Sequence, residues 1–141
     1  MDCARVSAVL FVKNLEKVAA FYSAALGMKR TFGDQDHSVL NCHGFELIVH
    51  QIPRDTADKN VIERPPKRRV WGAIRLDYPV HNIEACRRTA RSLGGDIDEV
   101  PPGWADRNAN FFFGYDPEGN QFGVSQHPSQ VPGASIGVTQ M

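Results

Sequence analysis

Glu46 and His50 are residue types that can transfer protons, and their spacing suggests that they share a face. They lie four residues apart in the apolar and β-branched run from Phe45 to Ile52, which predicts a strand. Side chains four positions apart on a strand point to the same side. At ordinary strand rise they are about 13 Å apart, too far to bind one metal ion together. Both are candidate acid–base residues, and an ordinary polar wall is the alternative for His50.

Gly123 interrupts the second strand of a predicted hairpin that runs from Phe113 to Gln126. The segment Asp116-Pro117-Glu118-Gly119 has the signature of a type I turn, with proline second and glycine fourth. A glycine inside a strand weakens that strand and often marks a place where another group comes close. We therefore expect Gly123 to leave room for another group.

The composition excludes several classes of partner. Sixteen basic and sixteen acidic residues cancel, so no long-range field favours nucleic acid or an anionic membrane. No apolar run is long enough to span a bilayer. Three widely spaced cysteines without a CxxC pair indicate reduced thiols, and the acidic second residue argues against a secretory signal. These features predict a cytoplasmic protein.

Two consecutive segments of the sequence have the same order of predicted elements: a strand, a helix and three further strands. These elements would position the candidate residues. The first helix follows Asn14, a favoured N-cap, and ends at Gly27; the second follows Asn82. This pattern favours an α+β fold built by internal duplication, although any two capped amphipathic helices look alike. The predicted ranges are a first module at 1–52, a linker at 53–70, a second module at 71–126 and a tail at 127–141.

Three segments resemble the vicinal oxygen chelate superfamily, which includes glyoxalase I, bleomycin resistance proteins and extradiol dioxygenases. They are VLFVKNLEKVAAFYSAALGM, IRLDYPVHNIEACRRTARSLGG and DPEGNQFGV. The segment from Trp104 to Arg107 is similar to a W-G-x-R motif of bleomycin-resistance-like members. The resemblance covers about residues 4–126 and implies two βαβββ modules, with a curled mixed sheet around a concave face and helices outside. Asn14 stands where the family usually has aspartate.

Metal-dependent members of that superfamily bring one ligand from each of four strands. The matching positions here are Ser7, Glu46, Ala73 and Gly123, of which Glu46 alone carries a carboxylate. Because a catalytic ion normally needs about three protein ligands, we expect no metal cofactor at these positions. The glycine would then open space where family enzymes project a carboxylate.

The superfamily fold and strand alternation together predict which side chains line the concave face. One of the expected strands runs from Trp71 to Val80, and on it Ile74 should point toward the helices. Large flat side chains suit an aromatic or heterocyclic ligand, and plain core packing is the alternative for the phenylalanine run. Arg75 could hold a ligand carboxylate or pair with Asp77 or Glu46. The candidate ligand-binding residues are Phe11, Glu46, His50, Trp71, Arg75, Trp104, Phe112 and Gly123.

The hypothesis that follows is a metal-free protein of the bleomycin-resistance kind that binds a small aromatic or heterocyclic molecule. The resemblance also implies a homodimer. The alternative is a glyoxalase-like lyase, an isomerase or a dioxygenase with an atypical site, in which Glu46 and His50 move protons. A partner subunit or regulatory module without a ligand is a third possibility.

Overall fold

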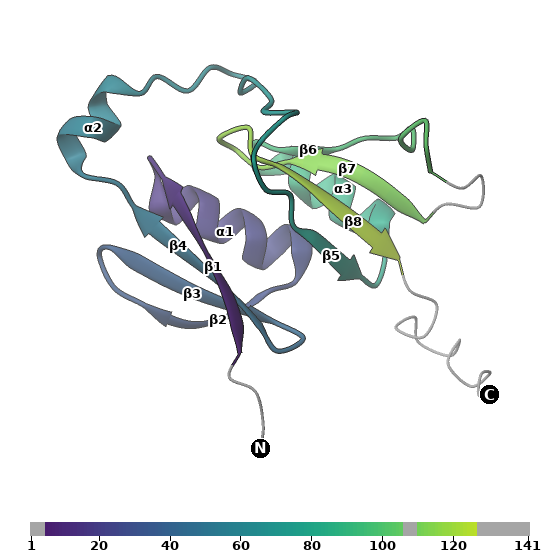
Figure 1. The fold of residues 1–141 in the computed structure, drawn as a ribbon, viewed down its shortest axis with the longest axis horizontal. Helices are drawn as coiled ribbons and strands as arrows, with labels where there is room; N and C mark the ends of the chain where they lie inside the picture. Colours follow the sequence, from purple (N-terminus) through teal and green to yellow (C-terminus); the bar gives the residue numbers. More distant parts are fainter. Residues whose placement is uncertain (1–4, 106–109, 127–141) are drawn as a thin grey trace.

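The computed structural model describes residues 5–105 and 110–126 and shows two four-stranded sheets with helices packed on one side (Figure 1). The fold is α+β, as predicted. No helix within these ranges is long and apolar enough to cross a bilayer. The elements are β1 (Val6–Val12), α1 (Leu15–Leu26), β2 (Lys29–Gly33), β3 (His37–Cys42), β4 (Phe45–Gln51), α2 (Arg54–Lys59), β5 (Asp77–Val80), α3 (Ile83–Ser92), β6 (Asp96–Ile97), β7 (Phe111–Tyr115) and β8 (Gln121–Gln126).

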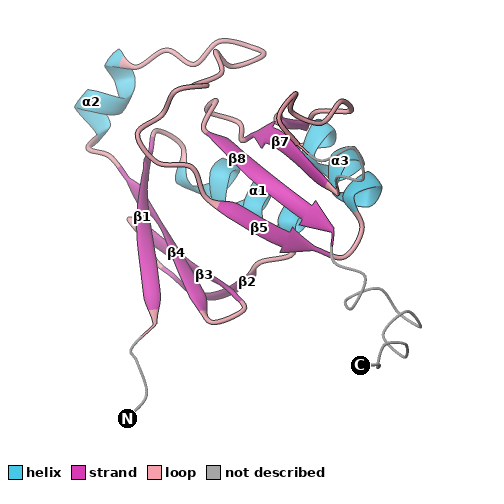
Figure 2. Ribbon diagram, turned by 45° about the vertical axis from the view of Figure 1, so that its right-hand side comes forward, coloured by secondary structure: helices cyan, strands magenta, loops and turns pink. Residues whose placement is uncertain are grey.

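Both sheets have the same topology, which confirms the two-module fold. The strand orders are β1-β4-β3-β2 and β5-β8-β7-β6. In each sheet the first and last strands of the module pair in parallel, and the remaining neighbours are antiparallel. The strands β1 and β5 therefore lie at sheet edges, and Figure 2 shows β1 at the edge of one group of strands and β5 at the edge of the other.

Both long helices start where the sequence predicts, and α1 also ends where it predicts. The side chain of Asn14 accepts a hydrogen bond from Lys17 N at 3.2 Å, and Asn82 accepts one from Ala85 N at 2.9 Å. Gly27 ends α1 in the left-handed conformation, with φ 73°, which costs a glycine little. The caps satisfy amide groups that a helix end otherwise leaves without a partner.

The two modules share one hydrophobic core. Tyr22 of α1 lies 6.1 Å, between ring centroids, from both Tyr78 of β5 and Phe122 of β8. Phe21, which is fully buried, lies 5.9 Å from Phe122. Burial of each such side chain contributes about 1.5–3 kcal/mol, so the first helix is held by residues of the second module.

The hairpin between β7 and β8 joins the modules through polar contacts. The buried carboxylate of Asp116 accepts a hydrogen bond from the Tyr22 hydroxyl at 2.8 Å. Glu118 accepts hydrogen bonds from the backbone N–H of Lys13 at 2.9 Å and of Asn14 at 2.7 Å. Because a carboxylate is favourable at a helix N-terminus, the turn both closes its own hairpin and anchors the start of α1.

The structure corrects the prediction for residues 71–80. The strand β5 begins at Asp77, which lies opposite Gly123 in the register of β8. In this register Trp71 and Ile74 would lie opposite residues that precede the start of β8 at Gln121, so they have no partner on β8, and they are 95% and 79% exposed. Ile74 therefore does not join the helix layer.

Two further predictions concern the linker at 53–70 and the tail at 127–141. Residues 53–70, expected to form a linker, contain the short helix α2. The expected tail at 127–141 lies outside the residues that the structure describes, as do two members of the Trp104–Arg107 motif, Asp106 and Arg107.

Candidate functional site

Each sheet has an open face, defined as the side turned away from α1 and α3. On the first sheet, strand alternation places Ala8, Leu10 and Val12 against the core, as predicted. The open face therefore carries Phe11, which is 64% exposed, and Glu46 and His50 of β4. The candidate residues of the first module therefore lie on the face that the sequence predicts.

Glu46 and His50 do not form one acid–base pair. Glu46 lies opposite Asn41 of β3 and forms an ion pair with Arg5 at 3.4 Å. His50 lies opposite His37, and its Nδ1 is 2.8 Å from the backbone carbonyl oxygen of Gln51. The two side chains have separate partners at separate ends of β4, so the geometry assigns them no joint proton transfer.

The four positions that correspond to metal ligands do not fit a metal ion. Ser7 and Glu46 lie side by side on β1 and β4, but Ala73 lies in the loop before β5 and has no donor side chain. Among residues 5–105 and 110–126 no group of three or more His, Cys, Asp or Glu side chains could hold an ion. Glu46 and a neutral serine hydroxyl are therefore the available donors, fewer than a catalytic ion needs.

The space over Gly123 is filled, so the prediction of an opening there is wrong. A Cβ built on Gly123 would lie 2.5 Å from Phe111 Cζ and would overlap Asp77 Oδ1. Real Cβ atoms do not approach other heavy atoms so closely. The glycine makes room for an aromatic ring and a carboxylate of the same chain.

An aromatic cluster covers the open face of the second sheet. Phe111 and Phe113 of β7 lie 5.5 Å apart, and the ring of Trp104 lies 5.5 Å from Phe111 and 6.0 Å from Phe113. Trp104 is 67% exposed, while the two phenylalanines are half-buried. We call Trp104, Phe111 and Phe113 the aromatic face.

The prediction that Phe112 lines the cavity is wrong. Phe112 lies opposite Val124 in the register, on the helix side of the sheet, and packs against the core. The guanidinium of Arg87 lies 5.2 Å from the centroid of the Phe112 ring. Arg87 is itself buried and donates to the carbonyl oxygen of Ile97 at 2.9 Å. Alternation in the observed register assigns Phe111 and Phe113 to the open face instead.

Arg75 joins the aromatic face to a carboxylate. Its guanidinium carbon lies 4.9 Å from the ring centroid of Phe113 and 5.5 Å from that of Phe111. The same guanidinium makes two hydrogen bonds to Asp77, at 2.7 and 2.9 Å. These hydrogen bonds raise the pKa of Arg75 and keep it cationic. Of the two possibilities left open by the sequence, the structure shows the internal pair with Asp77.

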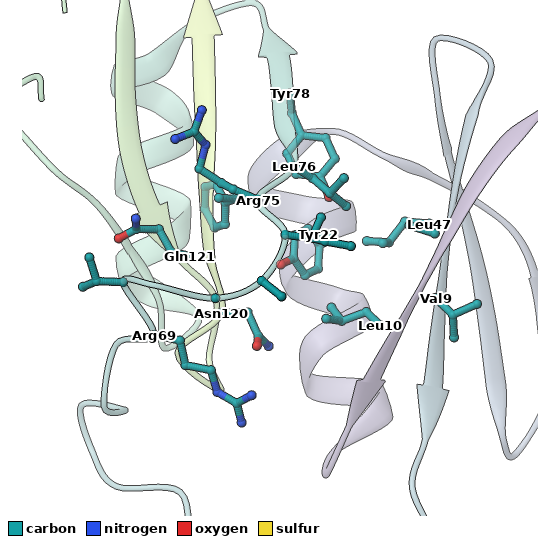
Figure 3. Close-up of a pocket in the computed structure, with 16 residues that line it drawn as sticks. Val9, Leu10, Tyr22, Leu47, Arg69, Arg75, Leu76, Tyr78, Asn120 and Gln121 are labelled. Atoms are coloured by element: carbon teal, nitrogen blue, oxygen red, sulfur yellow. The ribbon is translucent and has the colours of Figure 1, made fainter. Parts of the chain in front are cut away.

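A groove of about 240 Å³ separates the edge of the first sheet from the second module (Figure 3). Leu10 and Leu47 of the first sheet face Leu76 and Tyr78 across it. The groove is mainly apolar, and one of its lining residues is Arg75, which also contacts the rings of Phe111 and Phe113. The walls of the groove also include side chains that pack against the core shared by the two modules.

Residues 7–125 match the model of a family described as a glyoxalase-like domain. The chain belongs to the glyoxalase-like domain family. This membership and the fold place it in the vicinal oxygen chelate superfamily, as the sequence motifs predicted. No curated protein sequence gives a significant match.

Solved structures with this fold include three that have low sequence identity to this glyoxalase-like chain. A glyoxalase/bleomycin resistance protein from Albidiferax ferrireducens T118 has TM-score 0.61 at 19% identity, covering 87% of this chain and 98% of its own. The fosfomycin resistance protein FosX from Listeria monocytogenes has TM-score 0.62 at 13% identity, with 90% and 95% covered. A glyoxalase-related enzyme from Fulvimarina pelagi has TM-score 0.60 at 20% identity, with 87% of both chains covered. These similarities show the fold alone.

The glyoxalase-like chain has two site features that sequence reasoning missed. Phe113 takes the place expected for Phe112, because the phase of β7 depends on its register with β8. His37, the first residue of β3, lies directly opposite His50 near the end of β4. Only the pairing of β3 with β4 shows this proximity.

Proposed function

We propose that this protein binds a planar aromatic or heterocyclic small molecule on the aromatic face, without a metal ion at the four superfamily ligand positions. The observation that carries the proposal is the exposed indole of Trp104 beside Phe111 and Phe113. Large flat side chains around a cavity contribute stacking and apolar area to a flat ligand. A core tryptophan would be buried; this one lies on a loop and is 67% exposed.

The Arg75–Asp77 pair indicates how such a ligand would be oriented. The guanidinium and the carboxylate already neutralise each other, and their side chains remain 38% and 43% exposed. They can therefore donate to and accept from polar atoms on one edge of a ligand without requiring that the ligand carry a charge. The ligand class supported best is an uncharged heterocycle with polar edge atoms.

Trp104→Ala tests the proposal by isothermal titration calorimetry with three flat probes: neutral 2-naphthol, cationic proflavine and anionic 2-naphthoate. Loss of one stacking platform costs about 1–3 kcal/mol, so Kd for the best-bound probe should rise about 5- to 150-fold. The matched control is Phe32→Ala, which removes an aromatic side chain that is 54% exposed on the first sheet. Equal weakening by both variants, or no binding of any probe, would contradict the proposal.

We further propose that a second copy of the chain covers the exposed edges of the two sheets. Large apolar side chains are exposed on both modules: Phe11 is 64% exposed on the edge strand β1, and Trp71 and Ile74 are 95% and 79% exposed before β5. Exposed apolar surface of this kind can be covered by a partner chain. A second copy would bring the open face of one chain's first sheet toward the aromatic face of the other.

Sedimentation velocity tests the dimer. The 15.7 kDa chain should sediment with twice its mass at micromolar concentration, and Trp71→Glu should shift it toward the monomer because the interface would then bury a charge. Glu63→Gln, an exposed change in the connecting segment, is the control and should leave the dimer intact. A wild-type protein that remains monomeric as its concentration is raised would refute the arrangement.

A further inference from the structure

Two histidines face each other on neighbouring strands of the first sheet. His37 of β3 and His50 of β4 are direct partners in the antiparallel register. Their ring centroids are 4.3 Å apart, with the rings edge to face at 75°. Directly opposed residues of an antiparallel pair have Cβ atoms about 4.5–5.5 Å apart, so the two imidazoles share one patch of the open face.

Both rings are held through the same nitrogen. Nδ1 of His37 lies 3.3 Å from Oδ1 of Asp34, and Nδ1 of His50 lies 2.8 Å from the carbonyl oxygen of Gln51. A carboxylate and a carbonyl oxygen can only accept, so these contacts favour the tautomer in which Nδ1 carries the proton. The lone pair of each ring is then on Nε2. Histidines that bind metals characteristically donate their other N–H to a carboxylate or a backbone carbonyl.

We propose that His37 and His50 form a two-histidine site for a divalent transition metal ion, with both Nε2 atoms as ligands. A change in the side-chain torsions of His37, whose Nδ1 contact is the longer of the two, would turn its Nε2 toward that of His50. One ion could then take both nitrogens at metal–nitrogen distances of about 2.0–2.1 Å. Imidazole nitrogens suit nickel, copper and zinc, whereas magnesium and calcium prefer oxygen. The remaining coordination positions are open to water or to an oxygen or nitrogen donor on a small molecule.

The histidine pair is accessible to solvent, and an aromatic ring packs beside one of the two imidazoles. The side chain of His37 is 39% exposed, and a pocket of about 380 Å³ lined partly by Asp36 and Arg54 lies beside His50. On the side of β4 opposite His37, the ring of Phe11 lies 5.4 Å from that of His50. No third His, Cys, Asp or Glu completes the group in the described part of the chain, so the protein supplies two ligands.

This site differs from the four superfamily positions. Glu46 lies opposite Asn41, four register pairs along the strands from the His37–His50 pair. The proposal therefore does not depend on the aromatic face, which belongs to the second sheet. Binding at the histidines and binding of a flat molecule at Trp104 can be measured separately.

Calorimetric titration of the full chain with Ni²⁺ tests the site. We expect one saturable site per chain that His37→Ala and His50→Ala each abolish, while the control His81→Ala retains it. Asp34→Asn keeps an acceptor for the turn but removes the charge beside His37, and should weaken Ni²⁺ binding about 10-fold. Affinity should be higher for Cu²⁺ than for Ni²⁺, as the Irving–Williams order requires.

A second readout on the wild-type protein needs no substitution. Paramagnetic Ni²⁺ should broaden the amide resonances of β3 and β4 around His37 and His50 before any others in an ¹H–¹⁵N spectrum. Broadening centred elsewhere, retention of the site in both alanine variants, or the absence of saturable binding would overturn the proposal. Thermal melts of each variant show whether a lost site reflects a lost ligand or an unfolded chain.

Discussion

Asp116→Ala will lower the free energy of unfolding by about 3 kcal/mol. The carboxylate accepts hydrogen bonds from the Tyr22 hydroxyl at 2.8 Å, from the backbone N–H of Glu118 and Asn120, and from the side-chain amide of Asn120. A buried donor left without an acceptor costs about 1–3 kcal/mol, and part of that total is offset because the buried charge is also removed. Urea unfolding monitored by circular dichroism measures the change, which corresponds to a fall in Tm of about 10 °C.

The control for this substitution is Asp58→Ala, which removes an exposed carboxylate of α2 and should change stability by less than about 0.5 kcal/mol. A loss for Asp116→Ala no larger than that of the control would show that the hairpin does not join the modules. Tyr22→Phe should reproduce about 1–2 kcal/mol of the effect, since it removes one of these hydrogen bonds.

The same carboxyl group makes stability depend on pH. Burial raises the pKa of Asp116 above its usual value, although hydrogen bonds from Asn120, Tyr22 and Glu118 oppose this shift. A raised folded-state pKa gives a contribution that is fully present below the unfolded pKa of about 3.9 and is lost as pH rises through the folded pKa. Relative to Asp116→Asn, the wild-type protein should therefore gain stability as pH falls from neutral toward about 4.

Gly123→Ala will destabilise the protein by about 1–3 kcal/mol, the usual cost of overpacking a filled site. The added methyl group would collide with the ring of Phe111 and the carboxylate of Asp77. Asp77 cannot move freely, because Arg75 holds it through two hydrogen bonds. If the position were open, as the missing ligand suggested, alanine would cost little and could even stabilise the strand.

A double-mutant cycle measures how much of the loss of stability comes from the collision between the added methyl group and the Phe111 ring. Phe111→Ala combined with Gly123→Ala should cost less than the sum of the two single changes, because the methyl group would then enter space that the ring has left. Gly103→Ala is the matched control: a Cβ there meets nothing within 4 Å, so stability should stay nearly unchanged. Strict additivity in the cycle would contradict the account of Gly123.

Local signals predicted much of this fold. Asn14, Gly27 and Asn82 set the helix ends through side-chain and backbone geometry that depends on a few neighbouring residues. The alternation of β1 and β4 correctly separated core from open face, because both strands have a partner along their whole length. The motifs at the hairpin and the first helix were sufficient to indicate the superfamily.

The remaining features depend on register, which local pattern does not specify when every residue is aromatic. Phe111, Phe112 and Phe113 have nearly equal apolar character, so only pairing with β8 decides which rings face the helices. Trp71 was expected on a strand, yet the length of β8 leaves it without a partner. The contact between His37 and His50 likewise depends on how two strands align.

The central claim is that flat molecules bind on Trp104, Phe111 and Phe113. Intermolecular nuclear Overhauser effects in a complex with 2-naphthol test it directly, because they report which side-chain protons lie near the ligand. The account predicts contacts from the probe to the rings of Trp104 and Phe113. Contacts confined to the first sheet or to the walls of the groove, such as Leu10 and Leu76, would contradict it.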